Sequence, residues 1–571
     1  MSDKLFDRMM VAARSGSISR REVLENGLKL GLSTVAITSL MAVAPEASAA
    51  PKSTSLRGLA RQQGATTGTF TMLRDGGSPD LDPHSAYNNA AQAILLGSHE
   101  MLIQFKGEST FEYEPMLAET WEASADNSTF TFRIFAGVTF QDGDPCTATE
   151  VKASFDRFLL MGMGPVNVIS RFAPDPAMIE VVDEVTVRFN LGKPQPLFLS
   201  AMASSYGPFV INPKYVEENK TDDDPFAHEF FLNGSIGTGP YTLVENSVNE
   251  QVVMEKYDGY HGGWEAPHFD RLVVRITPEA TTRRQLVENG EADATVMNLT
   301  PEDYDAMKAN PDLQVVSAPS TAVYWTIMNA PLLKTPEVRQ GFSYAFPYEE
   351  IQQGVYKGLI NRSGPIASTV RGYDPDVFLY TTDLVKAKEL IIAGGFAEGD
   401  SFEYLFIGGD AVERSVAELF QANLAEIGFN LEVTSIDGAA MSDLVYGDSP
   451  AEERPHFIGG WGWWPDYNDA WNQLYPNFAT ASSGGGGSNA GYYVNTRLEE
   501  IMAQAEVYTD EAVYLELMKE AQQILTELDP PVLYYGELLW NTVLRKDIVG
   551  FNFNPLYLSA YPFHKMSRTT T

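Results

Sequence analysis

The chain has 571 residues, 44% of them hydrophobic and 11% aromatic, which is the composition of an ordinary globular protein with material for about three domains. Its 76 acidic and 40 basic side chains give a formal charge of -36, which repels phosphate backbones and argues against a nucleic-acid partner. The single cysteine, Cys146, excludes an intramolecular disulfide and a cysteine-based metal cluster, and we expect it to be buried. We expect no cofactor and no metal site.

The first 49 residues have the order of an export signal. Two arginines, Arg20 and Arg21, precede an uncharged apolar stretch at residues 30–43, and small residues at Ala47 and Ala49 fit cleavage after Ala49. The pair resembles a twin-arginine signal, and an ordinary secretory signal is the alternative. No cysteine lies at the cleavage site, so we expect a soluble protein in the periplasm of a Gram-negative bacterium and not a lipoprotein.

Beyond a flexible leader at residues 50–65, strands alternate with helices. Period-two patterns predict strands at residues 68–74 and 129–135, and Thr147 with Glu150 forms a capping box for a helix over residues 148–160. Later helices are predicted at residues 278–289, 301–309, 336–345, 383–393, 412–427, 496–508 and 511–528. A strand, a helix and a strand follow one another between residues 402 and 434, which favours a mixed α/β fold with a parallel or mixed sheet.

Residues 459–471 contain four of the eight tryptophans, together with Tyr467 and the carboxylates of Asp466 and Asp469. Glycine and proline argue against a long helix or a central strand here, so we expect an irregular segment. Flat apolar faces beside fixed charges indicate a ligand site. Any one ring taken alone fits a loop pinned to the core equally well, but the group of four favours a ligand-binding surface.

Several segments, in chain order, resemble the family-5 extracytoplasmic solute-binding proteins of ABC importers, the group with dipeptide, oligopeptide and nickel binders. They are residues 81–84, 140–145, 147–151, 237–241, 257–263, 338–345, 364–366 and 550–555. The resemblance implies an α/β fold of the periplasmic-binding-protein type II-like kind, with two lobes, an additional inserted subdomain and a two-strand hinge. It also implies an ABC permease as the partner of a monomeric protein.

On this pattern we expect lobe I at residues 66–98, 234–320 and 530–571, the inserted subdomain at 99–233 and lobe II at 321–529. Residues 317–329 and 532–544 are strand-like and are the hinge candidates. In such a fold the ligand binds between open lobes, and its higher affinity for the closed state shifts the population toward closure. We expect no enzymatic activity, because neither a Gly-x-Ser-x-Gly elbow nor a metal-hydrolase motif occurs.

Oligopeptide binders of the family have an aspartate, in an Asp-Tyr-Asn context, that pairs with the α-ammonium of the peptide. Asp466, Tyr467 and Asn468 reproduce that context. The resemblance therefore implies a charge-assisted bond from a ligand ammonium to Asp466. A loop-capping Asx turn is the alternative role of Asp466. We expect Asp469 to be an orienting or surface charge.

The rings of Trp461, Trp463 and Trp464 are expected to wall side-chain pockets or to stack on a cation or a sugar ring. Tyr324 and Trp325 lie on the first hinge strand, where alternation lets only one of them face the cleft, and we favour Trp325.

Three further residues complete the predicted site. Arg371 and Arg414 are candidates for the cation that binds a ligand carboxylate, although a surface role fits each of them taken alone. Tyr87 is expected to contribute from the lobe I side, by its position only.

The leading hypothesis is the capture of short peptides, or of peptide-like amino-acid conjugates such as opines, for import. A binder of oligosaccharides or glycosides is the alternative, because tryptophan-rich clefts also suit sugars. A binder of nickel or a metal chelate and an exported hydrolase follow, and His261 and His268 do not converge on a metal site in the sequence pattern.

Overall fold

The computed structural model describes residues 68–264, 267–296, 299–484, 487–558 and 560–569, so the predicted export signal and leader lie outside the described residues. Residues Thr67–Thr571 form one compact unit. Among the described residues, no helix combines the length and the apolar character needed to cross a bilayer.

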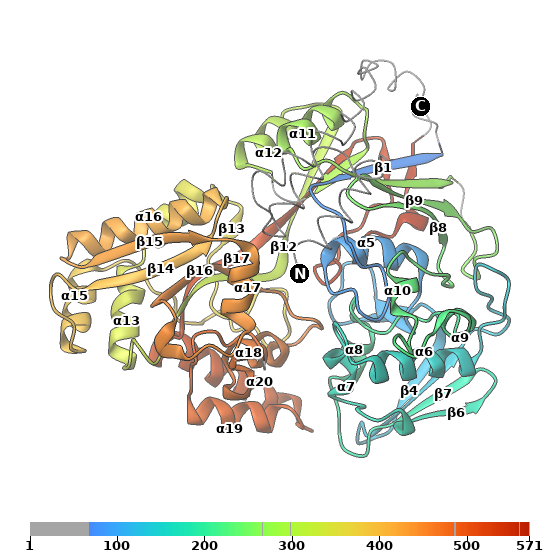
Figure 1. Ribbon diagram of the computed structural model, residues 1–571, viewed down its shortest axis with the longest axis horizontal. Helices are drawn as coiled ribbons and strands as arrows, with labels where there is room; N and C mark the ends of the chain where they lie inside the picture. The colour runs from blue at the N-terminus through green and yellow to red at the C-terminus, as the bar shows by residue number, and fades with distance from the viewer. Residues whose placement is uncertain (1–67, 265–266, 297–298, 485–486, 559, 570–571) are drawn as a thin grey trace, which may run out of the picture. The chain divides into compact units, whose positions relative to one another are not determined.

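An eleven-stranded mixed sheet organises this unit (Figure 1). Its order is β15-β14-β16-β12-β17-β11-β1-β10-β9-β8, and β13 pairs with β17 outside this path. The strands are β1 (Thr69–Arg74), β8 (Tyr241–Ser247), β9 (Gln251–Lys256), β10 (Arg271–Ile276), β11 (Ala294–Val296), β12 (Leu313–Met328), β13 (Ile360–Asn361), β14 (Ser401–Ile407), β15 (Asn430–Ile436), β16 (Phe457–Trp463) and β17 (Val532–Arg545).

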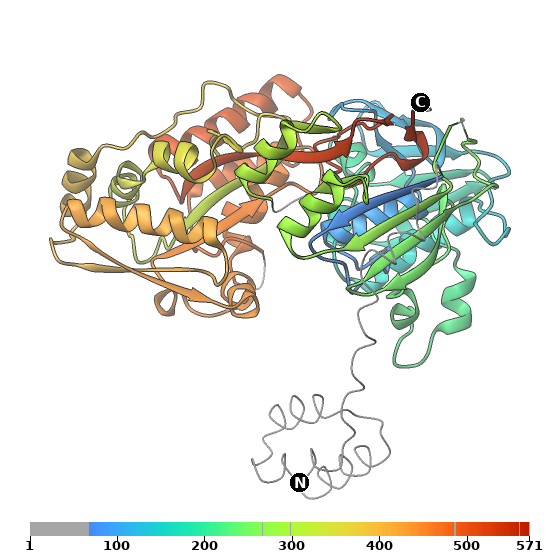
Figure 2. The same cartoon turned by 90° about the horizontal axis from the view of Figure 1, so that it is seen from above.

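Two long antiparallel strands, β12 and β17, belong to both halves of this sheet. Strand β17 pairs near its C-terminal end with β11, and β12 pairs near its C-terminal end with β16. The first half (β1 and β8–β11) and the second half (β14–β16) are therefore joined through these two strands, which Figure 2 shows from above. The strands predicted at residues 317–329 and 532–544 are confirmed.

Helices pack on both halves. The first half carries α5 (Asn89–Ser98), α11 (Ala280–Glu288) and α12 (Pro301–Lys308). The chain around the second half contains α13 (Pro336–Ala345), α15 (Leu384–Ala393), α16 (Ala411–Glu426), α17 (Gly438–Tyr446), α18 (Ala470–Phe478), α19 (Thr496–Ala505) and α20 (Glu511–Gln523). Strands β14 and β15 are parallel and flank α16 in sequence, which confirms the predicted strand-helix-strand unit.

Residues 99–233 build a separate four-stranded antiparallel sheet. Its order is β4 (Ala118–Ala123), β5 (Thr129–Ile134), β7 (Thr186–Asn190) and β6 (Ile179–Asp183), and α6 (Ala148–Met161) packs against it. The predicted capping box is present, because Thr147 and Glu150 bond to each other's backbone N–H groups at the start of α6. Cys146 is buried, as expected.

The same segment also contains a short hairpin and four short α-helices. They are β2 (Ile103–Phe105), β3 (Tyr113–Pro115), α7 (Asn167–Ser170), α8 (Phe198–Met202), α9 (Lys214–Asn219) and α10 (His228–Phe231).

A buried ion pair ties this segment to the chain before α5. Both guanidinium nitrogens of Arg157 on α6 donate to Asp82, at 2.8 and 2.6 Å. Burial raises the pKa of Asp82, but the hydrogen bonds and charge of Arg157 outweigh it, so that pKa lies below its ordinary value. Asp82 is therefore a charged, structural residue at the interface between two segments.

Candidate functional site

The tryptophan-rich segment begins as a strand in the middle of the sheet. Strand β16 lies between β14 and β12, so the expectation that glycine excludes a central strand here was wrong. The reason is packing, because a Cβ at Gly459 would overlap the Tyr404 hydroxyl and the Glu413 carboxylate. Glycine at this position lets a tyrosine and a carboxylate lie directly against the strand. The irregular part is confined to residues 464–469, before α18.

Asp466 lies in this irregular part of the segment. Its carboxylate accepts a hydrogen bond from the Tyr87 hydroxyl at 2.5 Å, and its backbone N–H donates to Asn472 Oδ1 at 2.6 Å. Burial raises the pKa of Asp466 to about 6, although the hydrogen bonds with Tyr87 and Asn472 act in the opposite direction. In the part of the chain that the structure describes, no lysine, arginine or histidine forms an ion pair with it.

The helix-capping role belongs to a different aspartate. Asp469 is the N-cap of α18 and accepts a hydrogen bond from the Trp471 N–H at 2.7 Å. The side chain of Asp466 bonds to Tyr87, which is distant in sequence, and to Asn472 on α18. The carboxylate of Asp466 is therefore not consumed by the turn that follows Pro465.

Aromatic rings from several distant segments surround Asp466. The ring of Tyr87 lies edge-on to Tyr206, with centroids 4.7 Å apart, and Trp464 bonds to the Tyr206 hydroxyl. On α17, Tyr446 lies 5.7 Å from Trp461 in a similar edge-on arrangement. Tyr87 is 46% exposed and Tyr446 43% exposed, so both keep ring surface for a ligand. The group combines one charged acceptor with accessible apolar faces.

The loop after β16 also contacts the segment of residues 99–233 directly. The Ser204 hydroxyl donates to the backbone oxygen of Asp466, and the Ser200 hydroxyl donates to that of Asn468 at 3.5 Å. The guanidinium of Arg171 stacks on Trp471 at 3.7 Å. Residues of the predicted inserted subdomain and of predicted lobe II therefore already touch around the Asp466 group.

Tyr467 and Asn468 are buried and hold the loop in place. Tyr467 is 1% exposed and packs edge-on against Phe172. The amide of Asn468 accepts from the Arg371 N–H at 3.1 Å and donates to the Thr110 backbone oxygen. Both side chains thus position the segment that carries Asp466.

Arg371 is committed to two carboxylates within the protein. Its guanidinium pairs with Asp469, which is fully buried, and with Glu511, and it also donates to the Tyr508 hydroxyl. Of the two roles expected for Asp469, the surface charge is wrong and the orienting charge agrees with this geometry. A ligand carboxylate would have to compete with these partners for Arg371.

The remaining predicted residues lie in three different environments. Trp325 is 1% exposed and packs against Phe478 and Tyr534, whereas its neighbour Tyr324 is half-buried. Trp463 is half-buried, and its indole N–H donates to the Asn472 backbone oxygen at 3.2 Å. Arg414 is exposed on α16, over the ring of Phe406. The structure does not bring Arg414 to the Asp466 group.

Sequence reasoning missed a buried carboxylate beneath β16. Glu413, which is 2% exposed, accepts hydrogen bonds from the hydroxyls of Tyr404 on β14 and Tyr535 on β17. The Tyr535 hydroxyl also bonds to Thr326 on β12 at 2.5 Å. Burial raises the pKa of Glu413 to about 7 against these hydrogen bonds. In the sequence, Glu413 has the signature of an ordinary first-turn glutamate, so no local pattern indicates its burial.

Tyr206 and Tyr446 were also missed, because each is an isolated tyrosine far in sequence from residues 459–471. Among the described residues, no group of three His, Cys, Asp or Glu side chains is placed to hold a metal ion.

Binding proteins of the periplasm or of ABC transporters match most of the chain. The probable D,D-dipeptide-binding periplasmic protein DdpA of Escherichia coli K12 is 28% identical over 504 residues, which cover 86% of this chain and 92% of that protein. The ABC transporter substrate-binding protein CtaP of Listeria monocytogenes has a TM-score of 0.77 at 22% identity, covering 88% of this chain and 99% of that one. The periplasmic binding protein DppA of Helicobacter pylori, solved with the peptide STSA, has a TM-score of 0.73 at 22% identity, covering 90% and 100%.

These likenesses confirm the predicted fold class. The sequence model of the family described as bacterial extracellular solute-binding proteins, family 5, matches residues 112–485. The chain therefore belongs to the family-5 extracellular solute-binding proteins, the substrate-binding components of ABC importers, as its sequence motifs predicted.

Proposed function

We propose that this protein captures short peptides, or peptide-like conjugates such as opines, by binding their ammonium group at Asp466, and that it delivers them to an ABC permease. The observation that carries this proposal is a half-buried carboxylate without a cationic partner among the described residues, beside accessible aromatic rings. The D,D-dipeptide-binding relative and the peptide complex of the H. pylori protein support a peptide ligand. We also propose that the protein is a soluble periplasmic monomer, that it binds its ligand without catalysing a reaction, and that it is exported by the twin-arginine route.

The chemistry of Asp466 suits an ammonium ligand. A carboxylate with a pKa of about 6 is largely ionised at neutral pH, yet it lies where water is restricted. A ligand ammonium would add a charge-assisted bond to the one that Tyr87 donates, and such bonds are about twice as strong as neutral ones. The rings of Tyr87, Tyr446, Trp461 and Trp464 would contact the apolar parts of the ligand.

The proposed domain map suggests how ligand binding would be coupled to closure of the two lobes. Lobe I comprises residues 66–98, 234–320 and 530–571, the inserted subdomain residues 99–233, and lobe II residues 321–529. Tyr87 then lies on lobe I and Asp466 on lobe II, so one ligand can touch both sides. Strands β12 and β17 would act as the hinge between an open and a closed state.

The test is calorimetric titration of the purified protein with alanyl-phenylalanine and with its N-acetyl form. We expect the free dipeptide to bind and Asp466→Asn to weaken it by about 3 kcal/mol, roughly 100-fold, because the ligand charge loses its partner. The N-acetyl form should bind both proteins equally weakly. Asp305→Asn, which removes an exposed charge on α12, is the matched control and should leave the affinity unchanged.

Two results would count against the proposal. Equal affinity of the wild-type protein and Asp466→Asn for the free dipeptide would remove the ammonium role of Asp466. Binding of a glycoside that is insensitive to Asp466→Asn, without any dipeptide binding, would favour the saccharide alternative.

A further inference from the structure

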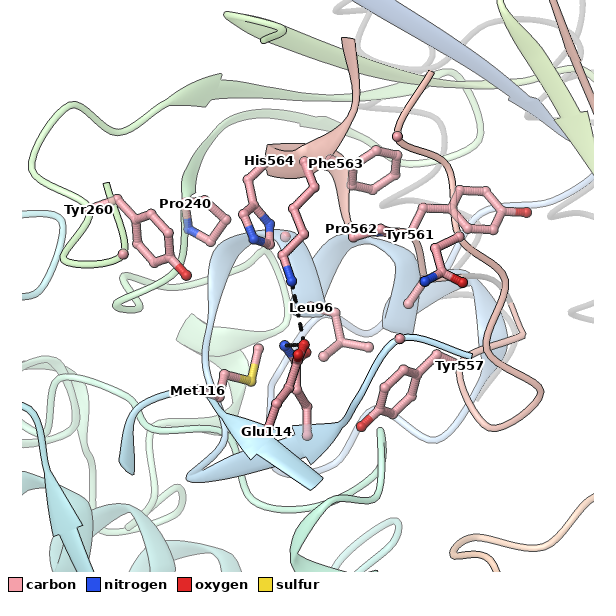
Figure 3. A pocket seen from close by; sticks show the side chains of 18 of the residues that line it. Leu96, Glu114, Met116, Pro240, Tyr260, Tyr557, Tyr561, Pro562, Phe563 and His564 are labelled. Carbon is pink, nitrogen blue, oxygen red and sulfur yellow. Dashed lines mark hydrogen bonds and ion pairs between the residues drawn. The ribbon is translucent and has the colours of Figure 1, made fainter. Parts of the chain in front are cut away.

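A cavity of about 940 Å³ lies beside α5. It is bounded by α5, the β2–β3 hairpin, the turn at residues 257–263 and the C-terminal segment at residues 550–567 (Figure 3). Asp466 and the tryptophans of residues 459–471 do not line it. Its volume is in the range of ordinary small-molecule sites.

A carboxylate lies at the centre of this cavity. Glu114 on β3 accepts a hydrogen bond from Gln104 at 2.8 Å and pairs with Lys565 at 3.4 Å, the contact drawn in Figure 3. Both contacts use Oε1, so Oε2 of Glu114 accepts no hydrogen bond from the described residues. Lys565 is 54% exposed, against 26% for Glu114, and a half-exposed pair of this kind contributes little stability. The carboxylate can therefore exchange this partner at small cost.

Two further acceptors belong to residues that line the cavity. Oδ1 of Asn552 is buried and has no hydrogen-bond partner among the described residues. The ring nitrogens of His564 have no hydrogen bond to any other described residue. Burial, together with the charge of Lys565, lowers the pKa of His564 to about 4, so the ring is neutral at pH 7 and one nitrogen is an acceptor. Lys565 is the one lysine or arginine among the described residues that line the cavity.

Aromatic rings cover much of the remaining wall. Tyr260 lies edge-on to His564 with centroids 5.8 Å apart, and Figure 3 shows Tyr557 and Phe563 on the same cavity. The Tyr260 hydroxyl donates to Glu100, and the Tyr557 hydroxyl donates to the Ala203 backbone oxygen. Since these hydroxyls are used within the protein, the two tyrosines add ring surface to the site more than they add donors.

We propose that this cavity is a second ligand site, for a small organic cation that carries a primary ammonium on an apolar or aromatic body. The ammonium would donate to Oε2 of Glu114 and to His564, and would displace Lys565 from the carboxylate. The body would pack against the rings of Tyr260 and Phe563. The formal charge of -36 favours the approach of a cation.

The test uses phenethylamine as the probe and 2-phenylethanol as its neutral counterpart, titrated calorimetrically into the Asp466→Asn protein. That background removes the charge proposed for the first site, so any binding reports on the second site. We expect phenethylamine to bind with a Kd of about 1 mM or tighter and 2-phenylethanol to bind at least about tenfold more weakly.

Three substitutions around the cavity should change the affinity for phenethylamine, two of them lowering it and one raising it. Glu114→Gln should weaken phenethylamine binding about tenfold, and His564→Phe, which keeps a ring but loses the acceptor, should weaken it severalfold. Lys565→Met should strengthen it severalfold, because the competing ammonium is gone. A variant that merely loosens the fold cannot produce this gain.

Two outcomes would overturn the inference. One is the absence of phenethylamine binding to the Asp466→Asn protein. The other is binding that neither Glu114→Gln nor Lys565→Met changes. Because the whole series is made without the Asp466 charge, its failure leaves the proposed peptide function untouched.

Discussion

Replacing Glu413 with glutamine should make the protein more stable at neutral pH and leave it unchanged in acid. Glu413 is fully enclosed by β14, β16, β17 and α16, and burial raises its pKa to about 7, whereas the same group in the unfolded chain has its ordinary value of 4.5. Glutamine keeps the shape of the protonated acid and carries no charge. The hydroxyls of Tyr404 and Tyr535 can still donate to its oxygen.

The expected size follows from the two pKa values. Below pH 4.5 the acid is protonated in both the folded and the unfolded state, so it does not change the free energy of unfolding. Between about pH 4.5 and 7 the unfolded chain releases the proton and the folded protein keeps it, so the free energy of unfolding falls as the pH rises. At about 1.4 kcal/mol per pH unit, the loss in the wild-type protein reaches about 3 kcal/mol near pH 7.

The assay is urea unfolding of the wild-type protein and Glu413→Gln, followed by tryptophan fluorescence, at several values between pH 4 and 8. The difference between the two proteins isolates Glu413 from the many other acids. It should be near zero at pH 4 and grow to about 3 kcal/mol in favour of the variant by pH 7. A difference that is constant with pH, or one that favours the wild-type protein at pH 8, would show that the carboxylate is ionised and satisfied in the folded state.

Three further predictions concern the site and its support. An ammonium ligand needs the ionised form of Asp466, so peptide affinity measured by calorimetry should be constant above about pH 7. Below about pH 6 the affinity should fall, approaching a tenfold loss for each pH unit. The affinity of Asp466→Asn should not change with pH over this range. Gly459→Ala should cost about 1–3 kcal/mol in urea unfolding and weaken ligand binding, since its Cβ meets Tyr404, whereas Gly438→Ala, which meets nothing within 4 Å, should be nearly neutral. Asp82→Asn should cost about 3–5 kcal/mol, because it leaves a buried arginine without its counter-charge; a loss under 1 kcal/mol would contradict this account of the pair.

Much of the local structure could be predicted because its causes lie within a few residues. The capping box at Thr147 and Glu150 uses groups three positions apart, and the helix Pro336–Ala345 begins and ends where the sequence predicts. The ordered motifs also indicated the family, and with it the mixed α/β fold and its two long shared strands.

The central position of β16 could not be predicted from propensity. Glycine weakens a strand considered alone. Here it is required, because the missing Cβ of Gly459 leaves space for the Glu413 carboxylate and the Tyr404 hydroxyl. The contacts that require glycine come from other elements, so the glycines of residues 459–471 by themselves did not indicate a central strand.

The sequence by itself determined most of the elements and the family, and it marked Asp466 in its Asp-Tyr-Asn setting as a candidate site residue. Only the tertiary structure decided the partners of that aspartate. Tyr87, which donates to Asp466, lies 379 positions earlier in the chain, and Arg371, a candidate for the ligand carboxylate, pairs with Asp469 and Glu511. Charge and ring type are properties of a residue and can be read from the sequence. Whether a charge is free or neutralised depends on which distant side chains the fold places within about 3 Å of it.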